Sequence, residues 1–170
     1  SAASDVYKRQ LIGSGGIGFS LVLEYTGRLR ELTTVRQMIH YIADAILYDG
    51  LPLAEAFFRC SMRMEGAYGA FLEKTAQQIE TFCGEDPAWL WKSNAAMLSD
   101  RLKKKDWEKF ADCMAQTGFS DPGGQVQVLR LYEEELSDQI IKLEKQKEEK
   151  CKLYQTIGIM AGVFICILLF

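Results

Sequence analysis

The sequence of 170 residues predicts an all-α protein, in which an antiparallel bundle of six helices is flanked by two membrane helices. Apolar residues between positions 28 and 152 recur every three or four residues, and no stretch shows the alternation of a strand. Turn residues break this pattern into segments with short connections, which favours antiparallel packing of neighbouring helices. Residues 153–170 carry no charge, as a membrane helix requires.

The first three helices are delimited by glycine and proline. The first is expected to stop at Asp49-Gly50, and Pro52 suits the first position of the second helix. Gly66 and Gly69 mark the entry to the third helix. The apolar stripes of these helices are Leu32, Val35, Ile39, Ile42 and Ile46, then Leu53, Ala56, Phe57 and Cys60, then Phe71, Leu72, Ala76 and Ile79.

The last three helices follow a turn at 83–87, where Asp86 is a candidate cap before Pro87. Gly118 is expected to close the fifth helix, and Asp121-Pro122 to open the sixth. The expected stripes are Trp89, Leu90, Trp91, Ala95 and Leu98, then Trp107, Phe110, Ala111 and Met114, then Val126, Leu129, Leu136, Ile140 and Leu143. The predicted bundle therefore covers residues 27–143.

The C-terminal part divides into a charged segment and an apolar one. Residues 144–152 are expected to form a helical stalk that is solvated between bundle and membrane. No apolar residue occurs from Glu144 to Lys150, and these seven residues span roughly 10 Å of helix. Residues 153–170 just reach the length of a membrane helix, and Tyr154 stands where an interfacial aromatic residue belongs. The alternative is a buried core helix that ends the domain.

The N-terminal end predicts a second, incomplete membrane helix. Residues 1–10 are polar, match nothing around them and look like translated adapter sequence, so they are set apart from the fold. Residues 11–26 are apolar and glycine-rich but short, which indicates a truncated transmembrane helix. A re-entrant or interfacial segment is the alternative.

Small residues recur in both apolar segments. Gly158 and Gly162 have the GxxxG spacing, and Ser14 and Gly18 share it. Such faces let helix backbones approach closely in lipid. We therefore expect these four residues to pack the two membrane helices together as a hairpin.

The basic residues predict the orientation in the membrane. Arg28, Arg30 and Arg36 follow the first apolar segment, and five lysines between positions 142 and 152 precede the second. Both groups lie on the side of the intervening bundle. Because basic residues concentrate in cytoplasmic loops, the bundle is expected to face the cytoplasm.

The composition excludes several classes of function. The net charge of −3, with no basic face that interleaves aromatic residues, argues against a nucleic-acid binder. The GSGGIG run at 13–18 has neither the preceding strand nor the spacing of a dinucleotide site, so no cofactor is expected. His40 is interpreted as structural rather than as a general base. The five cysteines show no metal-ligand spacing and are interpreted as reduced, small apolar residues.

Two charged segments are candidate partner surfaces. The first is the run Lys103-Lys104-Lys105, which is expected to form an exposed loop and could attract an acidic partner. The second is the stalk, with Glu144, Lys145 and Glu148 as the candidate docking residues. For both segments the simpler interpretation is a solvated face.

Three motifs in order resemble the stage III sporulation protein AB family. The first is residues 36–57, RQMIHYIADAILYDGLPLAEAF, a helix and turn followed by a Pro-Leu-x-Glu-Ala helix start. The second runs from 105 to 125 around GFSD at 118–121, and the third is the closing segment from Lys152, with its two glycines at 158 and 162. The chain departs from the pattern in its incomplete first membrane helix and in Asp44, where a longer acidic residue is expected.

The resemblance implies a six-helix bundle like the F-type platform protein of type II secretion. It also implies a non-enzymatic role in endospore formation, in a channel complex that joins mother cell and forespore. In that role the protein sits in the mother-cell membrane and works with a cytoplasmic secretion-type ATPase. Other components of the channel complex and further copies of the chain itself are the other candidate partners. The alternatives are a membrane-anchored scaffold that binds another soluble protein, and a membrane enzyme.

Overall fold

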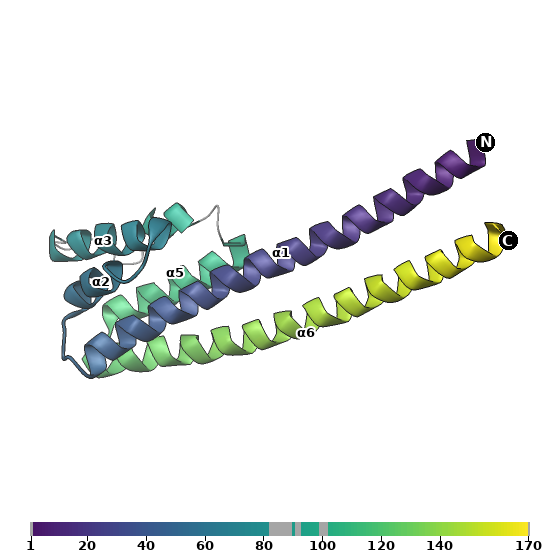
Figure 1. Ribbon diagram of the computed structural model, residues 1–170. Coiled ribbons are helices and arrows are strands. Elements are labelled where there is room, and N and C mark those ends of the chain that lie inside the picture. Colours follow the sequence, from purple (N-terminus) through teal and green to yellow (C-terminus); the bar gives the residue numbers. More distant parts are fainter. Residues whose placement is uncertain (1, 82–89, 91–92, 99–101, 170) are drawn as a thin grey trace. The chain divides into compact units, whose positions relative to one another are not determined.

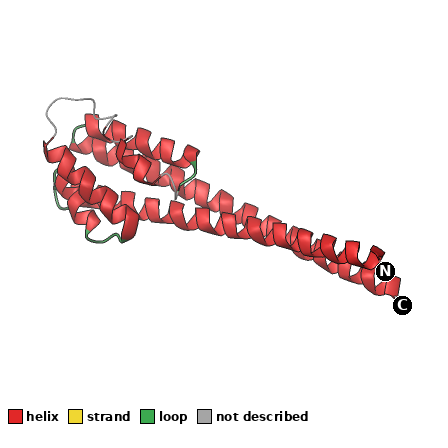
Figure 2. Ribbon diagram, turned by 90° about the horizontal axis from the view of Figure 1, so that it is seen from above, coloured by secondary structure: helices red, strands yellow, loops and turns green. Residues whose placement is uncertain are grey.

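The fold is that of a computed structural model, which describes residues 2–81, 90, 93–98 and 102–169, without the side chains of 2–19, 21, 119 and 169. The described part of the chain is all helical and contains no strand (Figures 1 and 2). This confirms the predicted all-α class. The elements are α1 (Ala2–Leu47), α2 (Leu53–Ser61), α3 (Gly66–Thr81), the short 3₁₀ helix η1 (Ala96–Leu98), α5 (Lys104–Phe119) and α6 (Pro122–Leu169).

The chain forms two compact units. One unit, here called the bundle unit, is Glu31–Asp138. The other, here called the terminal unit, combines Ser1–Arg30 with Gln139–Phe170. The long helices α1 and α6 each contribute to both units, so each unit is described by itself.

The corner between α1 and α2 follows the predicted turn. Helix α1 ends at Leu47, and Gly50 adopts a φ of +63°, a conformation that glycine reaches without steric cost. The N–H of Leu51 donates to the carbonyl of Ala45 at 3.2 Å, which closes the turn. Pro52 is the N-cap of α2 rather than its first helical residue, because its backbone is extended and its carbonyl accepts the first helical bond, from Ala56.

The turn between α2 and α3 depends on two glycines, as the sequence predicts. Gly66 begins α3 with a φ of +65°. Gly69 lies so close to the preceding turn that an added Cβ would stand 2.4 Å from the carbonyl oxygen of Met64. Only a residue without a side chain permits this approach, so Gly69 fixes how α2 and α3 meet.

The predicted fourth helix is described only in part. The expected turn at 83–87, with Asp86 and Pro87, and the expected core residues Trp89 and Trp91 lie outside the described residues. The other three predicted core residues, Leu90, Ala95 and Leu98, are buried. Asn94 is also buried and donates to the Thr75 hydroxyl at 3.2 Å, which anchors this segment to α3.

Helix α5 begins earlier than the sequence predicts. The prediction that Lys103–Lys105 form a loop is wrong, since Lys104 and Lys105 belong to the first turn of α5. The reason is local: Lys103 has the extended backbone of an N-cap, and its carbonyl accepts bonds from Asp106 and Trp107 at 2.8 and 3.1 Å. The three lysine side chains are exposed, as expected.

Most described residues of the predicted stripes lie in the core of the bundle unit, whereas Leu53, Ile79, Trp107 and Val126 are only half-buried. Phe71 of α3 and Phe110 of α5 meet edge to face, with ring centroids 5.5 Å apart. Within this unit α1 and α6 run antiparallel, because residues with increasing numbers on α1 contact residues with decreasing numbers on α6. The pairs are Arg36 with Ser137, His40 with Glu133, and Asp44 with Arg130. The largest fully buried side chains are Leu32, Met38, Ile39, Ile42, Phe57, Phe71, Leu72, Leu98, Phe110, Met114 and Leu129.

Helix α6 continues without a break from Pro122 to Leu169 (Figure 1). This confirms the expectation that one helix carries the charged segment directly into the apolar one. Leu136, Ile140 and Leu143 are buried, as the predicted stripe requires. In residues 144–150 every position except the half-buried Lys147 is exposed, which agrees with a solvated segment.

Candidate functional site

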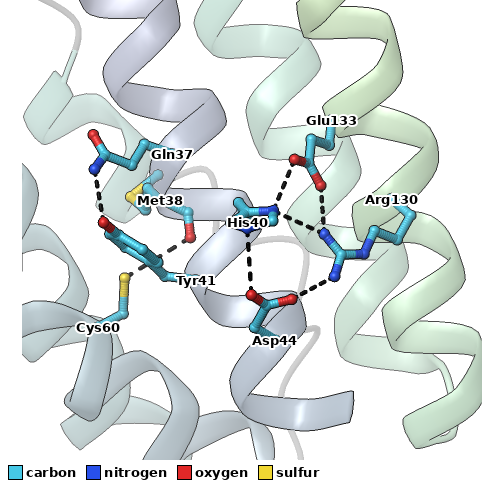
Figure 3. A network of polar contacts seen from close by, with 8 residues as sticks. All are labelled: Gln37, Met38, His40, Tyr41, Asp44, Cys60, Arg130 and Glu133. Carbon is cyan, nitrogen blue, oxygen red and sulfur yellow. Dashed lines mark hydrogen bonds and ion pairs between the residues drawn. The ribbon is translucent and has the colours of Figure 1, made fainter. Parts of the chain in front are cut away.

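Four ionisable side chains meet on the facing surfaces of α1 and α6 in the bundle unit (Figure 3). His40 and Asp44 are four residues apart on α1, and Arg130 and Glu133 are three apart on α6. These spacings place each pair on one face of its helix. The antiparallel packing then brings the two pairs together, and we call these four residues the charged cluster.

Arg130 joins the other three members of the charged cluster. Its Nη1 donates to Glu133 Oε2 at 2.7 Å and lies 2.9 Å from His40 Nδ1, while its Nη2 donates to Asp44 Oδ1. The guanidinium presents several donors in a fixed plane, so it can serve partners on both helices at once. Arg130 therefore links α6 to α1 through its contacts with His40 and Asp44.

His40 has two arrangements open to it. Its Nε2 is 3.3 Å from Asp44 Oδ2, and its Nδ1 is 2.9 Å from both Glu133 Oε1 and Arg130 Nη1. With the proton on Nε2 alone, the ring donates to Asp44 and accepts from Arg130. With both nitrogens protonated, it donates to both carboxylates and no longer accepts from Arg130.

The charges of the cluster depend on His40. Two carboxylates face one guanidinium, so the cluster carries one net negative charge when the imidazole is neutral and none when it is protonated. The hydrogen bond to Glu133 is the largest cause that raises the pKa of Arg130 above its ordinary value. Burial lowers it in part, and the hydrogen bond to Asp44 and the charges of both carboxylates raise it further. Arg130 thus stays charged at every physiological pH.

The chemistry of the cluster favours a structural role for His40, as the sequence analysis expects. Each side chain in it already has partners within the cluster. The side chains are between 21 and 46% exposed, so water screens their attraction only in part. Among the described residues no group of three or more His, Cys, Asp or Glu has the geometry of a metal site.

A groove of about 180 Å³ lies beside the cluster, between the last turns of α1 and the end of α2. Among its lining residues, Tyr41 accepts a hydrogen bond from Gln37 at 2.8 Å, and the buried Cys60 lies with its thiol 3.8 Å from the carbonyl of Met38 (Figure 3). Burial raises the pKa of Cys60 to about 12, so its thiol stays protonated and unreactive. The residues that line the groove are Tyr41, Asp44, Ala45, Tyr48, Asp49, Arg59, Cys60 and Arg63.

A second groove, of about 240 Å³, lies between α5 and α6. Lys109 and Glu135 form an ion pair at its edge, and the half-buried Val128 and exposed Leu131 line it. Its inner residue Cys113 is buried, which raises the pKa of this thiol to about 12 as well. Both described bundle cysteines thus behave as small apolar residues, in agreement with the sequence analysis.

The two predicted partner surfaces belong to different units. Lys103, Lys104 and Lys105 are exposed at the start of α5 in the bundle unit, and Lys104 lies 3.9 Å from Glu108. Glu144, Lys145 and Glu148 are exposed on α6 in the terminal unit. Their role in binding a partner stays a prediction.

The four residues of the predicted helix-packing faces are only partly described. Gly158 and Gly162 lie on α6, and no described atom comes within 4 Å of a Cβ added at either. Among the described atoms, nothing covers the face that these two glycines share. Ser14 and Gly18 are helical within α1, and their side-chain surroundings lie outside the described residues.

Sequence reasoning missed Asp44, Arg130 and Glu133 as members of one cluster. The available signal was the pairing of His40 with Asp44 and of Arg130 with Glu133 at helical spacing. That signal does not say which faces meet, because 86 positions separate Asp44 from Arg130. The groove between α1 and α2 was missed for the same reason.

The C-terminal part of α6 is the apolar surface that the sequence predicts. In the described part of the chain, α6 alone contains a stretch long and apolar enough to cross a membrane, and none of that stretch is buried. Its exposed large apolar residues are Leu153, Ile157, Ile159, Met160, Val163, Phe164, Ile167 and Leu168.

Comparisons with known proteins place the chain in a family. No curated protein and no solved structure matches it. The sequence model that describes stage III sporulation protein AB matches residues 10–170, nearly the whole chain. The chain therefore belongs to the stage III sporulation protein AB family.

Proposed function

We propose that this sporulation-family protein is a non-enzymatic platform in the inner membrane, within the secretion-like channel complex that joins mother cell and forespore during endospore formation. In this role its bundle unit binds a cytoplasmic secretion-type ATPase. The proposal includes a six-helix antiparallel bundle like the type II secretion F-type platform. It rests on the family membership together with the structure of α6.

The observation that carries the proposal is the change of environment along α6. The same uninterrupted helix has buried apolar residues such as Leu129 and Leu136, then an exposed charged segment, then a fully exposed apolar segment. An apolar surface of this length is costly in water and is matched by lipid. A single helix that belongs to both a folded domain and a membrane suits a platform that connects the two.

The proposed topology has two membrane helices. The second is 153–170, and the first is the apolar segment 11–26 at the start of α1. The basic residues Arg28, Arg30 and Arg36, with the lysines at 142–152, favour a cytoplasmic bundle in the mother cell.

The contacts of the charged cluster support the proposal that the protein has a non-enzymatic role. The polar atoms of His40, Asp44, Arg130 and Glu133 are used to join α1 to α6. Such a tie resists separation of the two helices, which is useful in a protein that transmits force. A membrane enzyme would instead lose activity when His40 is replaced, with its fold intact.

Crosslinking in sporulating cells tests the proposal directly. Cells that express the full chain are treated with a lysine-reactive crosslinker, and the adducts are identified by mass spectrometry. We expect an adduct with the secretion-type ATPase, and its absence from cells that contain both proteins would contradict the platform role. An adduct with a different soluble protein would favour the alternative of a membrane-anchored scaffold.

Reporter fusions test the topology. A native-length clone carries a reporter that is active only outside the cytoplasm, fused in turn after the bundle unit and at the C-terminus. The two-helix topology predicts an inactive reporter in the bundle and an active one at the C-terminus. A cytoplasmic C-terminus would contradict the hairpin.

A further inference from the structure

The groove between α1 and α2 combines aromatic rings with arginines. Tyr41 and Tyr48 come from α1 and its end, and Arg59 and Arg63 from the end of α2 and the following turn. Tyrosine and arginine are the residue types that most often carry the binding energy of protein interfaces. The proposed platform role uses Asp44 through the charged cluster and no other residue of this groove.

Both carboxylates that line the groove form ion pairs with arginine side chains. Asp44 accepts from Arg130 in the charged cluster, and Asp49 accepts from Arg59 at 2.7 Å. Arg63 differs, because among the described residues no ion pair includes it. The groove therefore offers one guanidinium whose charge no described carboxylate balances.

The environment of Arg63 leaves its donors accessible. Its guanidinium carbon lies 5.4 Å from the centroid of the Tyr41 ring, which is the distance of a cation–π contact. A cation–π contact uses none of the guanidinium N–H groups as hydrogen-bond donors, so these groups stay available for another partner. Those groups match the two oxygens of a carboxylate.

Each member of this contact has one further bond. Gln37 donates to the Tyr41 hydroxyl, and the backbone N–H of Arg63 donates to the carbonyl of Cys60 at 3.0 Å, which positions the backbone from which the exposed Arg63 side chain extends. Gly69 permits the close turn that follows Arg63. A site fixed in advance loses less conformational entropy when a partner binds.

Two large side chains at or next to the groove are open to solvent. Tyr48, which lines the groove, is 76% exposed, and Met62, which precedes Arg63 in the chain, is 69% exposed. A small anion would make no use of these side chains, whereas a protein segment would cover them. The surroundings of Arg63 therefore fit an acidic side chain that is accompanied by apolar neighbours.

We propose that this groove binds an acidic residue of a partner protein, with Arg63 pairing the carboxylate and with Tyr48 and Met62 covering apolar residues beside it. The identity of the partner rests on the proposed function, which makes it the secretion-type ATPase. The chemistry of the site rests on the groove alone. This surface is separate from the lysines at 103–105.

Binding to the full-length chain in lipid nanodiscs tests the proposal. The probe is the purified ATPase, and the variants are Arg63→Glu, Arg63→Lys and Lys104→Glu in the lysine run. The control is Lys74→Glu, which makes the same charge change at an exposed side chain of α3 outside the groove. We expect Arg63→Glu to weaken binding about tenfold or more, and Arg63→Lys to weaken it less because its single ammonium keeps the charge without the planar pair of donors. Lys74→Glu should bind nearly as the unsubstituted chain does. Unchanged binding by Arg63→Glu, with weakening by Lys104→Glu, would overturn the proposal in favour of the lysine run.

A crosslinking experiment separates the groove from the identity of its partner. A photo-reactive amino acid at position 48 is activated in sporulating cells, and the crosslinked peptide is sequenced. The groove proposal expects a peptide that contains Asp or Glu, whose adduct disappears in Arg63→Glu and returns when that acid is changed to Arg. An adduct with these properties on a protein other than the ATPase would keep the groove and reject the proposed partner. No adduct, or one indifferent to Arg63→Glu, would reject the groove whichever protein the platform binds.

Discussion

The guanidinium of Arg130 donates to the carboxylate of Asp44, and this contact joins α6 to α1 across 86 positions of the chain. Asp44 is also the residue at which the chain departs from the expected longer acidic side chain. A short carboxylate suffices there because Arg130 reaches across from the facing helix, while His40 lies 3.3 Å away on the same helix. The charged cluster is therefore built around the short side chain of Asp44.

The coupling between Asp44 and Arg130 can be measured with a double-mutant cycle. We expect Asp44→Asn and Arg130→Gln to be coupled by about 1 kcal/mol in the free energy of unfolding, because both side chains are about one-third exposed and their attraction is partly screened. Denaturant unfolding of the full chain in detergent gives this quantity. The matched control is the more exposed pair Asp49 and Arg59, for which we expect about 0.5 kcal/mol or less. Equal coupling in both cycles would contradict a special role for the cluster.

Gly69→Ala should destabilise the turn between α2 and α3. The new methyl group would stand 2.4 Å from the Met64 carbonyl oxygen, and the backbone must shift to remove this overlap. We expect a loss of about 1–3 kcal/mol in the free energy of unfolding. The control is Gly27→Ala in α1, where no described atom lies within 4 Å of the added Cβ and where alanine should be neutral or slightly stabilising. Similar stability of the two variants would contradict this prediction, because it would show that the backbone of the turn can shift at little cost in free energy.

The buried thiols predict a loss of stability in mild alkali. The pKa of both Cys60 and Cys113 is raised to about 12 by burial, from 9.0 in the unfolded chain. Because the unfolded chain loses these protons first, their contribution to stability is complete below pH 9 and declines as the pH rises from 9 toward 12. Between pH 8 and 9.5 we expect a loss of about 1.5 kcal/mol for the two thiols together. Unfolding measured at both pH values in the full chain and in the double variant Cys60→Ala and Cys113→Ala checks this, since the variant should lose much less.

Gly158 and Gly162 should be needed for contact with another membrane helix. Isoleucine at either position would cover the open small-residue face and keep a second backbone at a distance. We expect Gly158→Ile and Gly162→Ile to lower helix association about tenfold in a membrane reporter assay of the full chain. Met160→Ile is the control, because residue 160 lies on another side of the helix and keeps its apolar character. If Gly18→Ile on α1 has the same effect as Gly158→Ile, the partner is the predicted first membrane helix.

Local sequence was sufficient for most of the helices and for their ends. The stripes at three- and four-residue spacing predict the buried residues of α1, α3 and α6, because helical geometry alone decides which side chains share a face. The turn at Gly50 and the start of α3 at Gly66 could be predicted, because both positions have a positive φ, which glycine adopts without steric cost. The prediction of a loop at Lys103–Lys105 was wrong because Lys103 is the N-cap of α5 without a side-chain capping bond. A helix start without such a bond carries no strong sequence signal.

The sequence by itself determined that the chain is helical and that the end of α6 is apolar and uncharged, since both properties depend on neighbours within a few turns of one helix. Only the tertiary structure decided that His40 and Asp44 face Arg130 and Glu133, and that Arg63 stacks on Tyr41 without a carboxylate partner among the described residues. These contacts depend on how whole helices pack, and that packing is set by the summed fit of side chains such as Phe71 and Phe110, not by any local pattern.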